Sequence, residues 1–233
     1  RYAQTLFAVA QERDELRVVT EPQARPDPLE LYVDYEVWVP PGVHVMIDND
    51  NGNVSVARGV GQVSIHGRNA DVRVYGPTGP VQVETLNGRI RAYDLPAGAQ
   101  LTTVNGSIYA HMLGGALEAQ TTNGAIVAHV LTPEVTGCRL TNQNGGVTVT
   151  LEEGCSAWVK ADTQYGTVRC DLPVDTSQGA KERQRLIGAI GKGQAELHLT
   201  TLNGNVWITR GKSRGAQEPG GPVEAQQHPP DEE

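Results

Sequence analysis

The sequence predicts an all-β fold, a single-stranded parallel β-helix (β-solenoid) with about 18 residues in each coil. Asn-Gly pairs recur on a fixed spacing, as in TLNGRI at 85–90, TVNGSI at 103–108 and TTNGAI at 121–126. Apolar residues alternate with other residues after each glycine, and glycine accounts for 27 of the 233 residues. Short alternating strands joined by glycine bends on one period are typical of solenoids. We expect a right-handed coil.

Composition excludes several classes of protein. A formal net charge of -8 argues against a nucleic-acid partner, because such binding relies on Lys and Arg to neutralise phosphates. The apolar run at 6–10 is far shorter than the roughly 20 residues of a membrane-spanning helix, so we expect no transmembrane segment. Three cysteines without close spacing indicate neither a disulfide scaffold nor a thiol metal site. Cys138 and Cys155 are nearly one coil apart, which leaves a disulfide between adjacent coils open.

Upstream of the repeat, we divide the chain into an N-terminal segment at 1–12 and a region at 13–42. Residues 29–39 alternate between apolar and polar side chains, which predicts strands that lead into the first coil and cap the open end of the solenoid.

The solenoid is predicted to span 43–210, with each coil built from two unlike halves of nine residues. One half carries asparagine at its bend, and stacked asparagine side chains can hydrogen-bond along the solenoid as a ladder. The ladder residues are Asn51, Asn69, Asn87, Asn105 and Asn123. A second polar column, two residues earlier, is expected to support the bend; it contains Thr85, Thr103, Thr121 and Thr201.

The core is expected to come from residues two and four positions past each bend. All eighteen such positions in the regular repeat are apolar: Val54, Val56, Val63, Ile65, Val72, Val74, Val81, Val83, Ile90, Ala92, Ala99, Leu101, Ile108, Ala110, Leu117, Ala119, Ile126 and Ala128.

The period slips after residue 124, although the units continue. We attribute the slip to an insertion between 130 and 137 and to a charged loop insertion at 173–193. Residues 211–233 are polar and rich in Pro and Gly, which predicts a disordered tail.

With VPPGVHVMIDNDNGNV, LPAGAQLTTVNGSI and the closing IGKGQAELHLTTLNGNVWITR, residues 30–210 resemble the adhesin-like family of bacterial β-strand-repeat proteins, most of whose members are uncharacterised. The resemblance implies a single-stranded β-helix, often attached to the bacterial cell envelope or encoded near envelope-stress systems, with no established enzymatic activity. It therefore favours an extracytoplasmic or envelope location over a cytoplasmic one.

The candidate ligand-binding residues lie on one outward face, three and five residues past the asparagine bends. They are Arg73, Tyr75, Arg91, Tyr93, Tyr109, His111 and His129. Aromatic and imidazole rings beside guanidinium groups suit stacking on sugars and pairing with their acidic groups, or anchoring a protein partner. The same rings also stack along a solenoid for stability alone, so both interpretations stay open.

We expect no cofactor, no metal and no enzymatic activity. The bends lack the carboxylates of calcium-binding nine-residue repeats, and His111 with His129 makes a poor metal site without a third ligand. Outward positions show no pair of acids converging on one groove, as glycan hydrolysis needs.

These observations lead to three hypotheses. The first is a non-enzymatic binding or scaffolding module at the bacterial cell envelope, whose partner is an envelope glycan or envelope protein. The second is end-to-end self-association into a polymer like that of bactofilins, driven by strand pairing at a terminal coil. The third is a glycan-active enzyme.

Overall fold

The computed structural model describes residues 7–12, 15–20 and 33–211. It divides the chain into two compact units, Arg1–Trp38 and Val39–Glu233. In the first unit, β1 (Phe7–Glu12) and β2 (Glu15–Thr20) pair as an antiparallel two-stranded sheet. No helix among the described residues is long and apolar enough to cross a membrane. The tail expected at 212–233 lies outside the described residues.

The strands expected over 29–39 are absent where the chain is described. Residues 33–40 form no strand, and Tyr35, Val37 and Trp38 are exposed, Trp38 to 85%. Residues 29–32 lie outside the described part. Alternating apolar and polar residues form a strand only where a partner strand is present to pair with them. The two prolines that follow, at 40 and 41, also have no backbone N–H to donate to a neighbouring strand.

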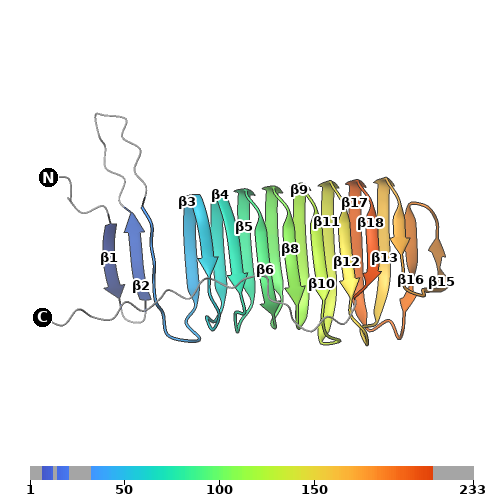
Figure 1. Cartoon of the computed structure of the whole chain (residues 1–233), viewed down its shortest axis with the longest axis horizontal. Helices are drawn as coiled ribbons and strands as arrows, with labels where there is room; N and C mark the ends of the chain where they lie inside the picture. Colours follow the sequence, from blue (N-terminus) through green and yellow to red (C-terminus); the bar gives the residue numbers. More distant parts are fainter. Residues whose placement is uncertain (1–6, 13–14, 21–32, 212–233) are drawn as a thin grey trace, which may run out of the picture. The chain divides into compact units, whose positions relative to one another are not determined.

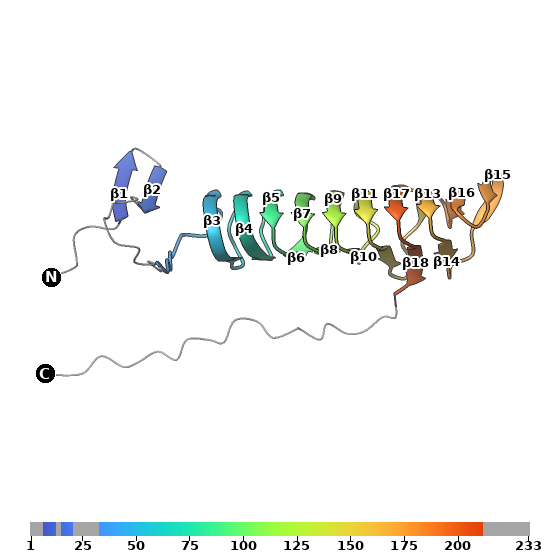
Figure 2. The ribbon, with the colours of Figure 1, turned by 90° about the horizontal axis from the view of Figure 1, so that it is seen from above.

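The second unit is a β-solenoid whose parallel strands form two long faces (Figures 1 and 2). At one end, β3 (Val45–Val56) and β4 (Val63–Tyr75) each contribute to both faces. The first face continues through β6 (Ile90–Leu95), β8 (Ile108–Met112), β10 (Ile126–Val130), β12 (Val147–Leu151), β18 (Val206–Arg210) and β14 (Val168–Cys170). The second face continues through β5 (Val81–Asn87), β7 (Ala99–Asn105), β9 (Gly115–Asn123), β11 (Val135–Asn144), β17 (Ala195–Asn203) and β13 (Ala157–Tyr165).

The register confirms the repeat. Val81 pairs with Ala99 and Ala99 with Leu117, each eighteen residues on. Leu117 then pairs with Cys138, twenty-one residues on, with an irregularity between Val135 and Gly137. The insertion predicted between 130 and 137 accounts for these three extra residues.

The core lies between the two faces and is built from small and branched side chains. All eighteen apolar positions predicted from the repeat are buried. Because inward side chains of successive coils lie in columns at the strand spacing of about 4.8 Å, each column packs with itself along the solenoid.

The asparagine ladder forms as predicted on the bend between the two faces. Each Asn side chain donates its Nδ2–H to the Oδ1 of the Asn in the preceding coil, from Asn69 to Asn51 onward, with N···O distances of 2.7–2.8 Å through Asn123. The ladder continues beyond the predicted members to Asn144 and Asn203, at 2.9 and 2.8 Å.

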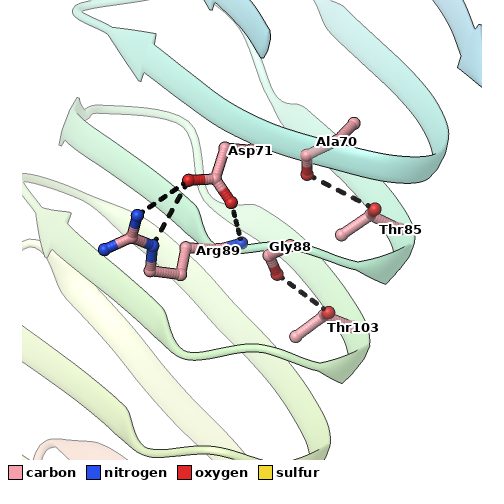
Figure 3. Close-up of polar contacts among 6 residues, drawn as sticks. All are labelled: Ala70, Asp71, Thr85, Gly88, Arg89 and Thr103. Atoms are coloured by element: carbon pink, nitrogen blue, oxygen red, sulfur yellow. Dashed lines mark hydrogen bonds and ion pairs between the residues drawn. The ribbon is translucent and has the colours of Figure 1, made fainter. Parts of the chain in front are cut away.

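The threonine column fixes the same bend from inside. The Thr103 hydroxyl donates to the Gly88 carbonyl at 3.1 Å and the Thr121 hydroxyl to the Gly106 carbonyl at 2.9 Å. Thr85 makes the equivalent bond to Ala70 at 3.4 Å (Figure 3). These hydroxyls are buried, so each bond also satisfies a group that water cannot reach.

Glycine is required next to the ladder because adjacent coils touch there through their backbones. A Cβ at Gly106 would collide with the Gly88 carbonyl oxygen, and a Cβ at Gly124 would collide with the Gly106 carbonyl oxygen. The spacing of the coils therefore leaves no room for a side chain at this position.

The coil order in space differs from the order in sequence. β17 and β18, the last strands of the chain, lie between β11–β12 and β13–β14, as Figure 1 shows. Asn203 pairs with Asn144 on one side and Tyr165 on the other. The coil of β17 and β18, which carries Asn203, therefore extends the asparagine ladder. The coil of β13 and β14 has Tyr165 at the same position and lies beyond the end of the ladder.

The segment expected as a loop insertion at 173–193 contains two strands. β15 (Asp175–Lys181) and β16 (Arg185–Ile190) pair antiparallel, and β16 pairs antiparallel with β13 at the end of the solenoid. Leu186 and Ile190 are buried. Charge and glycine obscured these strands in the sequence, and β15, largely exposed and irregularly paired, blunts the edge of the sheet.

The three cysteines are free thiols. Cys138 packs in the core between Leu117 and Leu197, and burial raises the pKa of its thiol to about 12. The disulfide between Cys138 and Cys155 that the sequence left open is not formed; the Cys155 thiol lies 3.6 Å from the Val130 carbonyl oxygen instead.

The bend contacts generate a stability prediction. Gly106→Ala places a Cβ against the Gly88 carbonyl, so we expect a loss of about 1–3 kcal/mol of unfolding free energy. Gly146→Ala is the control, since its Cβ would lie 3.5 Å from the Asn205 carbonyl oxygen, an ordinary contact. Urea unfolding of both variants measures the difference, and equal midpoints would contradict the steric account.

Candidate functional site

The seven predicted residues lie together on the outward surface of β4, β6, β8 and β10, and all are half-buried. We call the outward surface of β4, β6, β8, β10, β12, β18 and β14 the aromatic face. Its side chains form three rows along the solenoid. Row 1 lies next to the asparagine bend and begins at Asp71, row 2 begins at Arg73, and row 3 begins at Tyr75.

The side chains of row 1 form hydrogen bonds and an ion pair between neighbouring coils. Asp71 accepts the backbone N–H of Arg89 at 2.8 Å and pairs with the Arg89 guanidinium at 3.0 Å (Figure 3). The backbone N–H bond is the main cause that lowers the pKa of Asp71 below 3.8, and the Arg89 side chain acts in the same direction. Ser107 accepts the N–H of Ala125. These side chains hold the coils in register.

Row 3 is a continuous stack of rings. Tyr75 and Tyr93 stack nearly parallel, with centroids 5.0 Å apart and planes 9° apart. His111 meets Tyr93 edge-on at 5.2 Å, and His129 follows at 5.0 Å. In such a stack the tyrosine ring faces are turned toward neighbouring coils, which leaves edges and hydroxyl groups for the surface. The arrangement favours the stabilising role of these rings and offers tyrosine hydroxyls, rather than ring faces, to a ligand.

Tyr109 joins the two rows. Its hydroxyl lies 2.8 Å from His111 Nε2, and its ring contacts Tyr93 and His129. Burial raises the pKa of Tyr93, and the nearby Tyr75 raises it further. Burial also raises the pKa of Tyr109, with a smaller contribution from Tyr93. Both hydroxyls therefore remain protonated, as hydrogen-bond donors, at neutral pH.

The two histidines are held in the neutral form. Burial lowers the pKa of His111, the proximity of His129 lowers it further, and Asp94 opposes both. Burial also lowers the pKa of His129, against the effect of Glu152. At neutral pH the histidines contribute polar rings without charge.

Row 2 carries the positive charge of this face. Arg73 and Arg91 are direct neighbours on β4 and β6, and Arg91 neighbours Tyr109 on β8. Neither arginine forms an ion pair with any described residue, whereas Arg58 and Arg89 each pair with an aspartate. Adjacent like charges on paired strands are destabilising, and the Asp71 carboxylate of row 1 acts electrostatically on Arg91 against this effect.

A strained residue borders the face. Asp94 follows Tyr93 with φ 56, where β6 and β8 lose their regular register. Its carboxylate pairs with Arg58, two coils away, at 3.1 Å. The Arg58 side chain also lies close to Gly76, the residue that follows Tyr75.

Topology adds residues to the aromatic face that the repeat does not predict. Thr148, Trp207 and Arg169 continue row 2 on β12, β18 and β14. Thr150 and Thr209 continue row 3, with hydroxyls 3.1 Å apart. The repeat could not assign them because its period slips before them; an exposed Trp in the alternating NGNVWI unit was the available signal.

The opposite face differs in charge pattern. Its outward rows mix acids and bases, including Glu84, Glu118, Arg139 and Lys160. A shallow, open groove crosses the beginnings of its strands, lined among others by Gln82, Gln100 and Glu118. Within the described ranges, no group of three or more His, Cys, Asp or Glu side chains is placed to hold a metal ion.

Comparison with known proteins identifies one family. Residues 18–209 match the family model described as Toastrack DUF4097. No curated protein and no solved structure matches the chain.

The lowered pKa values of the histidines predict a pH dependence of stability. Between about pH 6.5 and the lower pKa values of the folded state, the unfolded chain binds more protons, so stability falls as pH falls. The contribution of ionised Asp71 to stability is lost only at lower pH, below 3.8, because its pKa is lowered in the folded state. We expect the double substitution His111→Gln, His129→Gln to flatten the change in urea midpoint between about pH 7 and about pH 5. A wild-type midpoint that stays constant over this interval would contradict the assignment.

Proposed function

This chain belongs to the Toastrack DUF4097 family, and we propose that it is a non-enzymatic β-solenoid that binds an anionic ligand through its aromatic face. It would act as a binding or scaffolding module at the bacterial cell envelope. The envelope location rests on the resemblance to bacterial adhesin-like repeat proteins described above.

The charge pattern carries this proposal. The chain has a formal net charge of -8, yet row 2 holds no carboxylate from Arg73 to Arg169, and row 3 holds none from Tyr75 to Thr209. The carboxylates of Asp94 and Glu152 lie at the edge of row 3, near the histidines. Arg73 and Arg91 form no ion pair with any described carboxylate, although Asp71 of row 1 acts electrostatically on Arg91. Guanidinium groups pair with carboxylates and phosphates through planar, two-point hydrogen bonds, so an anionic group of a ligand is the complement of this pair.

The shape of the face suits an extended ligand. Its side chains lie in straight rows at the strand spacing, and the stacked rings fix the orientation of the tyrosine hydroxyls. A surface that is rigid before binding loses little conformational entropy on binding. Rows of hydroxyl, imidazole and guanidinium groups along one axis match a repeating polar chain better than a small apolar molecule, which prefers a concave pocket.

Removal of the two guanidinium groups tests this proposal. We expect Arg73→Gln, Arg91→Gln to lower the affinity for polygalacturonate, an anionic polysaccharide, by tenfold or more, because each charged hydrogen bond contributes roughly 1.5–3 kcal/mol. The matched control is Arg139→Gln, Lys160→Gln, which removes the same charge from the opposite face. Titration calorimetry with polygalacturonate and with its neutral methyl ester provides the measurement.

Wild-type protein that binds neither polymer, or equal losses in the two double variants, would refute a specific anionic site on the aromatic face. Binding of the methyl ester as tightly as the free acid would refute recognition of the carboxylate.

A second candidate function is self-association through the open end of the solenoid. Among the described strands, β3 pairs only with β4, and Val45 and Ile47 are only partly buried at this end. Of the aspartates in β3, Asp50 lies 3.8 Å from the Arg68 guanidinium and Asp48 lies 3.7 Å from the His66 ring. Because β15 and β16 cap the other end, pairing of two open ends gives a closed dimer rather than the bactofilin-like polymer.

Sedimentation of the full chain over a concentration series tests this second candidate. We expect a monomer–dimer equilibrium that Ile47→Lys shifts to monomer, because a charge is introduced at the open core edge, whereas Thr176→Lys in the capping strand β15 leaves it unchanged. Monomers at every concentration would rule out the dimer, and particles that grow beyond dimers would favour the polymer.

A further inference from the structure

The aromatic face continues well beyond the residues that the repeat predicted. β18 lies between β12 and β14, so row 2 continues from Val127 and Thr148 to Trp207 and ends at Arg169. Trp207 is 45% exposed, and Arg169 is exposed. Neither is part of the regular repeat, and Trp207 lies between Thr148 and Arg169 because β18 inserts between β12 and β14.

Trp207 differs from the tyrosines of this face in the freedom of its ring. Each of the three tyrosine rings contacts at least one neighbouring tyrosine or histidine ring. Trp207 makes no ring–ring contact with any described residue; its strand neighbours in row 2 are Thr148 and Arg169. A partly exposed indole that lies outside the ring stack is suited to packing against the apolar face of a sugar ring or another flat group.

Trp207 has an arginine on one side in row 2, as Tyr109 has at the other end of the row. Arg169 neighbours Trp207, as Arg91 neighbours Tyr109, and Arg169 forms no ion pair with any described residue. Six strand-to-strand steps separate β4 from β14 on this face, which places Arg73 and Arg169 roughly 29 Å apart at about 4.8 Å for each step.

The surface between the two charged ends is uncharged at neutral pH. It consists of Val127, Thr148, the Thr150–Thr209 hydroxyl pair and His129. A ligand that reaches both ends therefore crosses a polar strip that offers hydrogen bonds, with the Glu152 carboxylate at its border near His129.

We propose that Trp207 and Arg169 form a second recognition point on the aromatic face, and that the ligand is a linear anionic polysaccharide lying along the solenoid axis. This inference rests on the proposed function and adds the class of ligand, its direction and two further binding residues. The indole packs on a sugar ring, and Arg169 pairs with an acidic substituent as Arg73 and Arg91 do at the other end. Linking two contact points on one chain raises the affinity for long ligands above that for short ones.

Substitution of Trp207 in the full chain tests this inference. We expect Trp207→Ala to lower the affinity for long-chain polygalacturonate about tenfold, as for an aromatic residue that dominates a contact, and Trp207→Phe to retain most of the affinity. Digalacturonate, too short to reach both ends, is expected to bind more weakly than the polymer to the wild-type protein and to lose less in Arg169→Gln than the polymer does.

Tryptophan fluorescence provides a readout that does not depend on loss of stability. In a Trp38→Phe, Trp158→Phe chain, Trp207 is the one remaining tryptophan of the three in the sequence, and polygalacturonate is expected to shift its emission. If wild-type protein binds polygalacturonate through Arg73 and Arg91 but Trp207→Ala binds equally and the emission does not shift, the second recognition point is refuted while the proposed function stands. If wild-type protein does not bind the polymer, both fail. An equal shift with polyglutamate would refute selectivity for a polysaccharide.

Discussion

The whole architecture depends on the close contact between coils at the asparagine bend. There the backbone of one coil lies against the glycine carbonyl of the preceding coil, with no space for a Cβ at Gly106 or Gly124. The Asn ladder and the buried Thr hydroxyls satisfy the polar groups on the two sides of the same bend. Because every coil must meet these demands at the same position, the coils remain in register and both faces keep straight rows of side chains.

This constraint separates the positions that build the fold from those that are free to vary. The bend and the inward columns keep the same chemistry from coil to coil, whereas the outward rows change from arginine to tyrosine, histidine, threonine and tryptophan. In a chain of net charge -8, the outward rows of one face lack carboxylates along most of the solenoid, while those of the other face mix both signs. The asymmetry between the two faces is therefore our main reason for assigning recognition to the aromatic face.

Much of this fold could be predicted from the sequence because its determinants are local and repeated. The Asn ladder, the Thr column and the eighteen buried apolar positions follow from one period. The insertion of β17 and β18 could not be predicted in the same way, since it is a long-range pairing; the fit of Asn203 beside Asn144 becomes evident only in the structure. The same limit applies to β15 and β16, whose pairing depends on the exposed edge of β13, and to the segment at 33–39, where alternation has no partner strand.

The candidate site, too, could be predicted from the sequence only in part. The period placed Tyr75, Tyr93, His111 and His129 in one row, but it could not show that the tyrosine rings stack on each other instead of facing the surface. Nor could it place Trp207, whose position on this face depends on the strand order.

The central claim, that the aromatic face binds an anionic chain along the solenoid axis, is tested most directly by mapping backbone amide shifts with NMR during titration with polygalacturonate. The account predicts that the perturbed amides lie in β6, β8, β10, β12, β18, β14 and the part of β4 that pairs with β6, and that β5, β7 and β9 are unaffected. Perturbations centred on β5, β7 and β9, or none at saturating polymer, would contradict it.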